Sequence, residues 1–349
     1  MVKKTSVISI AGFILLCVGR TSWAAEATDW FHRAKWGVLT HYLGAPPSSA
    51  GGAELTAEKW NAQVDAFDVA GLTGQLRSTG TKYFVITLGQ NSGHYCSPNA
   101  TYDKIVVIRP SKCSRRDLIK DLYEALEPHG IRLMVYLPSG APAADPVAVE
   151  KLQWAWGRAD GWPRGGPLTH DRLVPFQRKW EAVVREWSRR WGKHVHGWWI
   201  DGCYFADDMY RFEDAPNFAS FAAALKAGNP DSIIAFNPGI KLPVVCHTKY
   251  EDYTAGEVTL RQLPRAVASC PGRWLERDGH KVQYHILSFL GKTWCGGEKP
   301  QLPDATIIGY TRQLIDKGAV ITYDVPIGTN GLILEPFVEQ LRAVGRAVR

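Results

Sequence analysis

The sequence lacks several patterns that mark common classes of protein. Its 349 residues contain no Cys-x-x-Cys pair and no His-Glu-x-x-His, so neither a structural zinc site nor a zinc-dependent hydrolase is indicated. No Gly-x-Gly-x-x-Gly follows a predicted strand, which argues against a dinucleotide-binding sheet. Gly-x-Ser-x-Gly is also missing, which weakens an esterase interpretation. We therefore predict no metal and no other cofactor.

The chain also lacks runs of Lys and Arg. Its formal net charge is +7, and three of the basic residues, Lys3, Lys4 and Arg20, lie near the N-terminus. A modest, scattered positive charge is unlike the basic surfaces that bind nucleic acids. Nucleic acid is therefore not an expected partner.

No hydrophobic run is long enough to cross a bilayer comfortably. Lys3 and Lys4 precede an apolar stretch from about Val7 to Val18, and Ser22-Trp23-Ala24 offers small residues at the two positions that a signal peptidase reads. We expect residues 1–24 to be a cleaved signal peptide and residues 25–349 to form one domain. The mature protein would be secreted or periplasmic, with no membrane span.

Cysteines are few, and Cys17 falls within the expected signal peptide. The remaining six are Cys96, Cys113, Cys203, Cys246, Cys270 and Cys295. An even number in an exported protein permits disulfides. Cys96–Cys113 and Cys246–Cys270 are the candidate local pairs, although the sequence does not determine connectivity.

Predicted strands and helices alternate along the mature chain. We predict strands over Trp36–Tyr42, Tyr83–Leu88, Ile131–Leu137, Val195–Ile200, Ser232–Asn237, Val282–Phe289 and Ala319–Val325. Helices are predicted from Asp68 to Ser78, from Ser114 to Pro128, and over Val174–Trp191, Asn217–Lys226, Asp304–Asp316 and Glu335–Val348. This order implies a parallel sheet, and nearly eight units imply closure as a single-domain (β/α)8 TIM-like barrel. An open doubly wound sheet is the alternative.

Polar residues stand where the predicted strands end. In a parallel barrel the carboxyl ends of the strands carry the active site, and Pro138–Pro175 would be a long loop overhanging it. The residues at these ends are His41-Tyr42, Gln90 to Tyr95, Tyr136, Ser139, Asp201, Asn237 and Asp324. Asp201 follows the apolar run Trp198-Trp199-Ile200 and precedes Gly202. It is either a catalytic carboxylate or a cap for the following turn. A lone histidine such as His41 is more often structural than catalytic.

Tryptophan is abundant, with 14 residues. Indole rings stack on sugar rings, while amides and imidazoles bind hydroxyls. Three tryptophans of one predicted helix, Trp180, Trp187 and Trp191, fit a core position. Others lie in predicted loops and could either contact a sugar or fill the core: Trp154, Trp156, Trp162, Trp274 and Trp294.

Four collinear segments resemble the α-L-fucosidases of glycoside hydrolase family 29. They are Trp30–Tyr42, similar to W-x-x-A-K-F-G-I-F-x-H-W; Thr79–Thr87, similar to A-G-A-K-Y-x-V-L-T; Trp198–Gly202, similar to W-x-D-G; and Gly318–Ile333, similar to G-N-L-L-L-N-x-x-P-x-x-D-G-x-I. The family's second strand usually ends in a sugar-binding His pair, and here Gln90 and Asn91 stand in its place. We expect a divergent member that lacks the family's C-terminal β-sandwich.

The resemblance implies a retaining glycosidase that cleaves terminal α-linked fucose or a related sugar from oligosaccharides or polysaccharides. Asp201 would be the nucleophile. Glu257, in a segment similar to the family's D-x-x-T-P-E, would be the acid/base, with Glu276 and Glu251 as rivals and a solvated loop carboxylate as the alternative for Glu257. The expected substrate-binding residues are His41, Tyr42, Gln90, Asn91, His94, Tyr136, Trp199 and Asn237.

Three other functions remain open at this stage. The same barrel could act on a different sugar, such as an α-galactoside, because a changed set of polar residues can change which sugar fits. It could bind carbohydrate without catalysis, or form a protein-interaction barrel with a degenerate site. A separation well beyond ~9.5 Å between Asp201 and every other carboxylate would exclude the glycosidase mechanism.

Overall fold

Seven parallel strands form the central sheet, in the order β10-β11-β1-β2-β3-β6-β7. The computed structural model describes residues 23–44, 55–140, 142–157, 168–169, 171–203 and 210–349. The strands of the sheet are β1 (Trp36–Thr40), β2 (Tyr83–Thr87), β3 (Arg132–Pro138), β6 (Val195–Asp201), β7 (Ile233–Phe236), β10 (His285–Phe289) and β11 (Val320–Asp324). Each of the seven lies on one of the predicted strands, which confirms the predicted α/β barrel.

The eighth position of the barrel is filled by an irregular segment, residues 252–258, which we call the closing segment. Its Asp252 N–H donates to the carbonyl of Ile234 in β7 at 2.8 Å. On the other side, the Leu287 N–H of β10 donates to the carbonyl of Gly256 at 2.9 Å. The closing segment therefore joins the two edges of the sheet through backbone hydrogen bonds.

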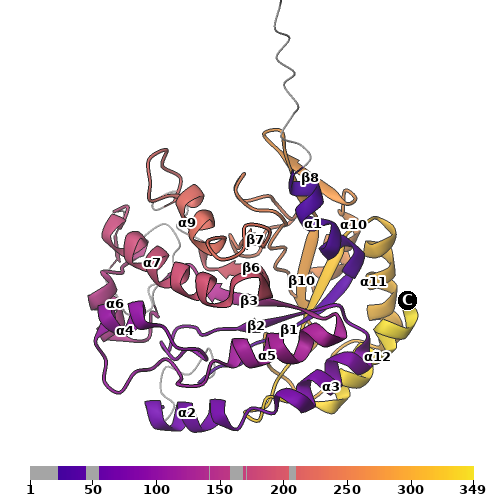
Figure 1. The fold of residues 1–349 in the computed structure, drawn as a ribbon. Helices are drawn as coiled ribbons and strands as arrows, with labels where there is room; N and C mark the ends of the chain where they lie inside the picture. Colours follow the sequence, from indigo (N-terminus) through magenta and orange to yellow (C-terminus); the bar gives the residue numbers. More distant parts are fainter. Residues whose placement is uncertain (1–22, 45–54, 141, 158–167, 170, 204–209) are drawn as a thin grey trace, which may run out of the picture.

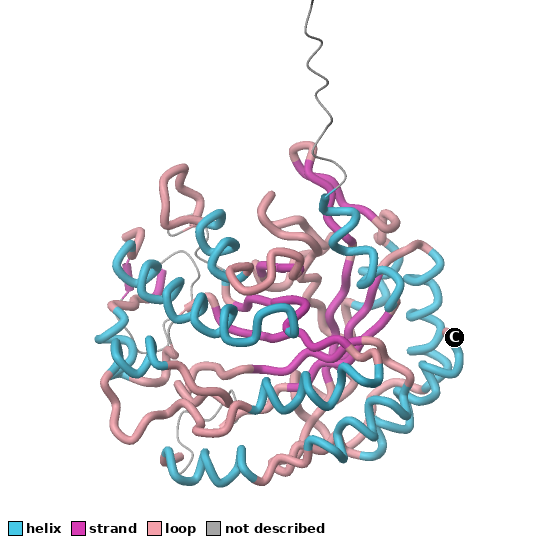
Figure 2. Tube along the Cα trace, in the orientation of Figure 1, coloured by secondary structure: helices cyan, strands magenta, loops and turns pink. Residues whose placement is uncertain are grey.

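Helices cover the sheet, all but the first of them on its outer side (Figures 1 and 2). They are α1 (Trp23–Ala34), α2 (Ala57–Asp65), α3 (Val69–Thr79), α4 (Ala100–Val106), α5 (Leu118–Leu126), α6 (Pro146–Leu152), α7 (Val174–Trp191), α9 (Phe218–Leu225), α10 (Leu263–Ala268), α11 (Asp304–Asp316) and α12 (Glu335–Ala347). None of the helices described is both long and apolar enough to cross a membrane.

Side chains alternate between the outer and inner faces of each strand, because a strand has a period of two. In β6, Trp198 and Ile200 belong to the outer core beneath the helices, whereas Trp199 lies inside the barrel. Other interior residues obey the same alternation: Leu39, Tyr83, Val85, Met134, Tyr136, Ile233, Ala235, Tyr253, Ala255, Leu287 and Val320. The next inward position at the carboxyl end of β6 is Asp201.

Helix α1 covers the amino-terminal end of the barrel. Its Phe31 is fully buried among interior residues, with its ring 4.9 Å from those of Tyr83 and Tyr253. Gly37 makes room for this layer, since a Cβ there would lie 2.2 Å from the Tyr83 ring. The polar carboxyl ends of the strands thus form the accessible mouth.

The structure corrects several local predictions. Ser114 does not cap α5: Asp117 does, by accepting from the Lys120 N–H, while the Ser114 hydroxyl donates to the carbonyl of Arg116. The predicted strand 282–289 is divided into β9 (His280–Gln283), which pairs with β8 (Trp274–Arg277), and β10. The predicted loop 138–175 contains α6 and a short pair of strands, β4 (Trp156–Gly157) and β5 (Leu168–Thr169).

The predicted local disulfides are absent. All six cysteines outside the expected signal peptide are free thiols. Two of the paired candidates contact carbonyls elsewhere, Cys96 at Thr87 and Cys270 at Gly272. The proposed signal peptide stays a prediction, because residues 1–22 lie outside the described residues.

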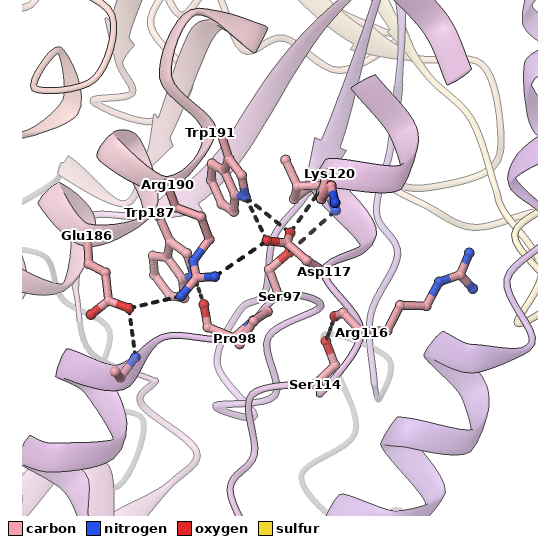
Figure 3. A network of polar contacts seen from close by, with 12 residues as sticks. Ser97, Pro98, Ser114, Arg116, Asp117, Lys120, Glu186, Trp187, Arg190 and Trp191 are labelled. Atoms are coloured by element: carbon pink, nitrogen blue, oxygen red, sulfur yellow. Dashed lines mark hydrogen bonds and ion pairs between the residues drawn. The ribbon is translucent and has the colours of Figure 1, made fainter. Parts of the chain in front are cut away.

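A partly buried polar network connects the loop after β2 to α7 (Figure 3). The Asp117 carboxylate caps α5, and it also accepts from the Ser97 hydroxyl at 2.8 Å and from the Trp191 indole N–H at 3.1 Å. Nearby, Glu186 of α7 accepts from the first two N–H groups of α4 at 2.8 and 2.7 Å. Two carboxylates therefore hold the helical layer behind the β2 loop that contributes Gln90.

Replacing Asp117 with Ala should remove a helix cap and leave the buried Trp191 N–H without an acceptor. We expect the free energy of unfolding to fall by about 2–4 kcal/mol, measured by urea denaturation. Asp117→Asn, which retains a cap oxygen, should cost less. The control is Glu124→Ala on the same helix: its exposed ion pair with Lys120 should contribute no more than about 0.5 kcal/mol. Equal losses in Asp117→Ala and Glu124→Ala would contradict the role of the network.

Candidate active site

The Asp201 carboxylate lies at the inner mouth of the barrel, at the last residue of β6. Its Oδ2 accepts a hydrogen bond from the Tyr136 hydroxyl at 2.5 Å, and its Oδ1 accepts from the Asn237 amide at 2.8 Å. Gly202, with φ of 72°, turns the chain away directly afterwards. Asp201 therefore does more than cap a turn: both of its oxygens are held inside the barrel by side chains of neighbouring strands.

Asn237 connects two carboxylates. The same amide nitrogen that donates to Asp201 also donates to Oε2 of Glu257 at 2.7 Å. Asn237 itself is fully buried, and its backbone is fixed beside β6 because its N–H donates to the carbonyl of Ile200 at 2.8 Å. The two carboxylate oxygens are consequently no further apart than the sum of two short hydrogen bonds.

Glu257 comes from the closing segment. Gly256, with φ of 64°, allows the segment to approach β10 closely, since a Cβ there would lie 2.0 Å from the His285 carbonyl oxygen. Burial and the neighbouring charge of Asp201 raise the pKa of Glu257 to about 7, against smaller opposing effects of Asn237 and His41. The environment thus favours the neutral acid at Glu257 beside Asp201.

His41 lies across the mouth from this pair, on the residue after β1. Its Nδ1 is 2.9 Å from Oδ1 of the fully buried Asp324, at the end of β11. Burial lowers the pKa of His41, but the charge and hydrogen bond of Asp324, with the charges of Asp201 and Glu257, together raise it above its usual value. These neighbours therefore favour the protonated form of the imidazole.

Tyr136 and Gln90 complete this inner wall. The Gln90 amide donates to the Tyr136 hydroxyl at 2.7 Å, so Gln90, Tyr136 and Asp201 form a chain of hydrogen bonds. Trp199 stacks on the Tyr136 ring with centroids 5.2 Å apart, and its indole N–H donates to the carbonyl of Ala255. Trp199 is buried and supports Tyr136 from within the barrel, so it offers little surface to a sugar.

Three other predicted binding residues lie apart from this cluster. Tyr42 packs between Trp60 and Phe67 in the outer core, and its hydroxyl donates to the carbonyls of Gln63 and Thr329. His94 is also buried, beside Trp60. Asn91 is half-buried, and its carbonyl accepts from the Ala144 N–H. None of the three has a hydrogen bond with the Asp201 cluster in the described contacts.

The two rival carboxylates also lie elsewhere. Glu251 is buried, accepts from the His247 N–H at 2.6 Å, and its pKa is raised to about 8 by that burial. Glu276 lies on the hairpin of β8 and β9, largely exposed, near Lys281. Of the three candidates, only Glu257 shares a hydrogen-bond donor with Asp201.

Two residues of the mouth were named from the sequence but not included among the predicted catalytic and substrate-binding residues. Trp294, in the loop after β10, is half-buried with its ring 6.5 Å from that of His41. Asp324 lies at the carboxyl end of a predicted strand, and that position was the only signal for it. A small hollow adjoins Glu257, lined by Pro238, Gly239, Lys241, Val244, Val245 and Gly256.

The described residues contain no group of three or more His, Cys, Asp or Glu side chains arranged to hold a metal ion. The candidate site is instead the pair of carboxyl groups of Asp201 and Glu257, both hydrogen-bonded to the amide of Asn237. The side chains of His41, Tyr136 and Trp199 lie around this pair. Such a site can combine a carboxylate nucleophile with a carboxylic acid.

Comparison with known proteins supports the fold. No protein-family model matches the chain, and no curated protein matches it. Among solved structures, it is similar to the endo-fucoidan hydrolase MfFcnA4 of glycoside hydrolase family 107, with a TM-score of 0.68 and 18% identity over 92% of this chain. The chain spans about half of that protein, 53% of its length.

For two further structures, the match with this chain covers a larger share of the other protein. The family 107 endo-fucoidan hydrolase P5AFcnA has a TM-score of 0.65 and 15% identity, over 90% of this chain and 92% of that one. The α-L-fucosidase isoenzyme 1 from Paenibacillus thiaminolyticus has a TM-score of 0.60 and 14% identity, over 93% and 75%. At these identities the similarity establishes the fold: this chain has the barrel found in glycoside hydrolases.

Proposed function

We propose that this protein is a retaining glycoside hydrolase that cleaves α-linked fucose or a closely related sugar from glycans. The observation that carries the proposal is the Asn237 amide nitrogen, which hydrogen-bonds both Asp201 at 2.8 Å and Glu257 at 2.7 Å. Retaining glycosidases place their two carboxyl groups about 5–5.5 Å apart, and inverting ones about 6.5–9.5 Å apart. A shared donor suits the shorter separation.

In the proposed reaction Asp201 attacks the anomeric carbon while Glu257 gives its proton to the departing glycosidic oxygen. The bond from carbon to that oxygen breaks as the bond to the Asp201 carboxylate forms, leaving a covalent glycosyl-enzyme. Glu257, now ionised, then takes a proton from water, whose oxygen attacks the anomeric carbon and releases Asp201. The raised pKa of Glu257 suits a group that must first be an acid and then a base.

The partners of Asp201 suit a nucleophile. Tyr136 and Asn237 each hold one oxygen, so the carboxylate has a fixed orientation before substrate binds. A group held in place by buried neighbours loses little entropy on reaching the attacking geometry. Gln90 extends this support by donating to the Tyr136 hydroxyl.

The choice of sugar rests on similarity. The solved structures with this fold include proteins named as endo-fucoidan hydrolases and an α-L-fucosidase. His41, Gln90 and the half-buried Trp294 provide hydrogen-bonding groups and one aromatic face at the mouth, as sugar sites do. The hollow beside Glu257 would receive the leaving group, because the acid must face the glycosidic oxygen.

The proposal includes export. A cleaved signal peptide over residues 1–24 would deliver the enzyme to the periplasm or the medium, where it would meet oligosaccharide or polysaccharide substrates. We propose no nucleic-acid partner, since basic residues form no run in the sequence. Mass determination of the exported protein would identify its first residue.

Asp201→Asn should lower kcat/KM for 4-nitrophenyl α-L-fucoside by at least about 10³-fold, because the amide is a poor nucleophile. Binding of the sugar, measured by calorimetry, should persist. In Asp201→Gly, added azide should restore turnover by attacking from the vacated face, and the product should be the glycosyl azide of inverted configuration. Asp231→Asn, an exposed carboxylate before β7, is the matched control and should retain activity.

Glu257→Gln tests the acid. In the wild type, kcat/KM should fall as the pH rises through about 7, because the raised pKa of Glu257 means that the required proton is lost there. The variant should lose this alkaline limb, and it should be impaired far more on a disaccharide than on an aryl glycoside whose leaving group needs no proton. Glu276→Gln should leave the limb in place; loss of the limb in Glu276→Gln instead would reassign the acid.

A panel of substrates separates the alternatives. Turnover of α-galactosides but not fucosides would support the proposed mechanism and show that the sugar is not fucose. Cleavage of fucoidan polymers but not aryl fucosides would indicate endo action. Sugar binding that Asp201→Asn leaves intact, with no turnover of any substrate by the wild type, would favour a carbohydrate-binding barrel.

A further inference from the structure

The Asp324 carboxylate is fully buried at the carboxyl end of β11, yet it takes no part in the proposed reaction. Each of its oxygens has one partner. Oδ1 lies 2.9 Å from Nδ1 of His41, and Oδ2 accepts from the backbone N–H of Cys295 at 2.6 Å. A buried carboxylate is costly unless it is fully hydrogen-bonded, so these two partners explain how it is tolerated.

The first partner fixes the imidazole of His41. With Nδ1 occupied by Asp324, the remaining nitrogen, Nε2, is left to face the mouth. The groups that face the ring are the carboxyl groups of Asp324, Asp201 and Glu257, the Tyr136 ring with its centroid 5.1 Å away, and the Trp294 ring at 6.5 Å. A doubly protonated imidazole only donates hydrogen bonds, so such a His41 would bind the oxygen of a sugar hydroxyl.

The second partner fixes the turn that follows β10. Cys295 has φ of 49°, a conformation that non-glycine residues rarely adopt without support. The bond from its N–H to Asp324 supplies that support, and the turn is closed by the Lys292 N–H donating to the Gly296 carbonyl at 2.9 Å. Trp294 precedes Cys295 directly, with its ring against Phe289 at 4.9 Å.

We propose that Asp324 is a positioning residue that holds both His41 and the Trp294 turn, and so builds the wall of the mouth that receives the sugar. The inference rests on the proposed function. In this arrangement one carboxylate joins the imidazole of His41, a hydrogen-bonding group for hydroxyls, to the aromatic face of Trp294, two groups separated by more than 250 positions in the sequence.

Asp324 also acts on Glu257 through His41. A positive charge on His41 lowers the pKa of Glu257. The charge of Asp324 in turn raises the pKa of His41 and so favours its protonated form. Removing the Asp324 charge should therefore make His41 neutral at lower pH and let the pKa of Glu257 rise. The alkaline limb of activity would move to higher pH, although kcat/KM itself would fall.

Asp324→Asn tests this, because it preserves shape and can still accept from the Cys295 N–H while donating to a neutral His41. We expect NMR titration of ring-labelled histidine, with His41 assigned from His41→Gln, to show a lower pKa for His41 in the variant. In parallel, kcat/KM should fall by about 10- to 100-fold, the range for losing a charge-assisted hydrogen bond, with the alkaline limb displaced upward.

A buried carboxylate outside the mouth provides the matched control. Glu181 of α7 is buried and accepts from the Ser220 hydroxyl at 2.6 Å. Glu181→Gln should change neither the His41 titration nor the position of the alkaline limb. A purely structural role for Asp324 would lower activity and stability in Asp324→Asn without displacing either.

His41→Gln provides a second measurement that does not depend on folding of the Asp324 variant. It removes the cation beside Glu257, so it too should displace the alkaline limb upward. An unmoved His41 titration in Asp324→Asn, or an unmoved limb in both variants, would overturn the proposal. Failure of the proposed function would look different: the wild type would turn over no glycoside, while the His41 titration would still respond to Asp324→Asn.

Discussion

The side-chain amide of Asn237 connects the two carboxyl groups at the centre of the barrel mouth. The Asn237 nitrogen has two hydrogens, and each is given to a different carboxylate, on β6 and on the closing segment. Two carboxylates this close resist simultaneous ionisation, so one of them holds its proton to a higher pH than usual. Burial of Glu257 and this repulsion together raise its pKa, and the proposed division into nucleophile and acid follows from that shift.

Everything else at the mouth depends on which side chains can reach it. A strand presents alternate residues inward, so only the last inward residue of each strand can line the carboxyl end. Asp201, Asn237, Glu257, His41 and Asp324 all follow inward-facing residues of the barrel by two positions. The small interior residues Ala235 and Ala255 lie beneath Asn237 and Glu257, while the stacked Trp199 and Tyr136 fill the interior beside them, on β6 and β3.

Much of the fold could be predicted because it depends on local patterns. Continuous apolar runs located all seven strands, and α7 and α11 begin and end at their predicted residues. The eighth position could not be predicted, because the closing segment is held by backbone bonds to β7 and β10 rather than by a strand-like pattern of its own. Its irregular backbone, with φ of 64° at Gly256, places Glu257 in the mouth.

The sequence by itself determined that a carboxylate would end an apolar strand and that polar residues would gather at one end of a parallel barrel. Only the tertiary structure decided which of them meet. Tyr42 follows His41 by one position, and that single step sends it to the outer core, while Asp324, far along the chain, lies against His41. The reason is physical: pairing register and side-chain direction are properties of neighbouring strands, and no single strand's sequence contains them.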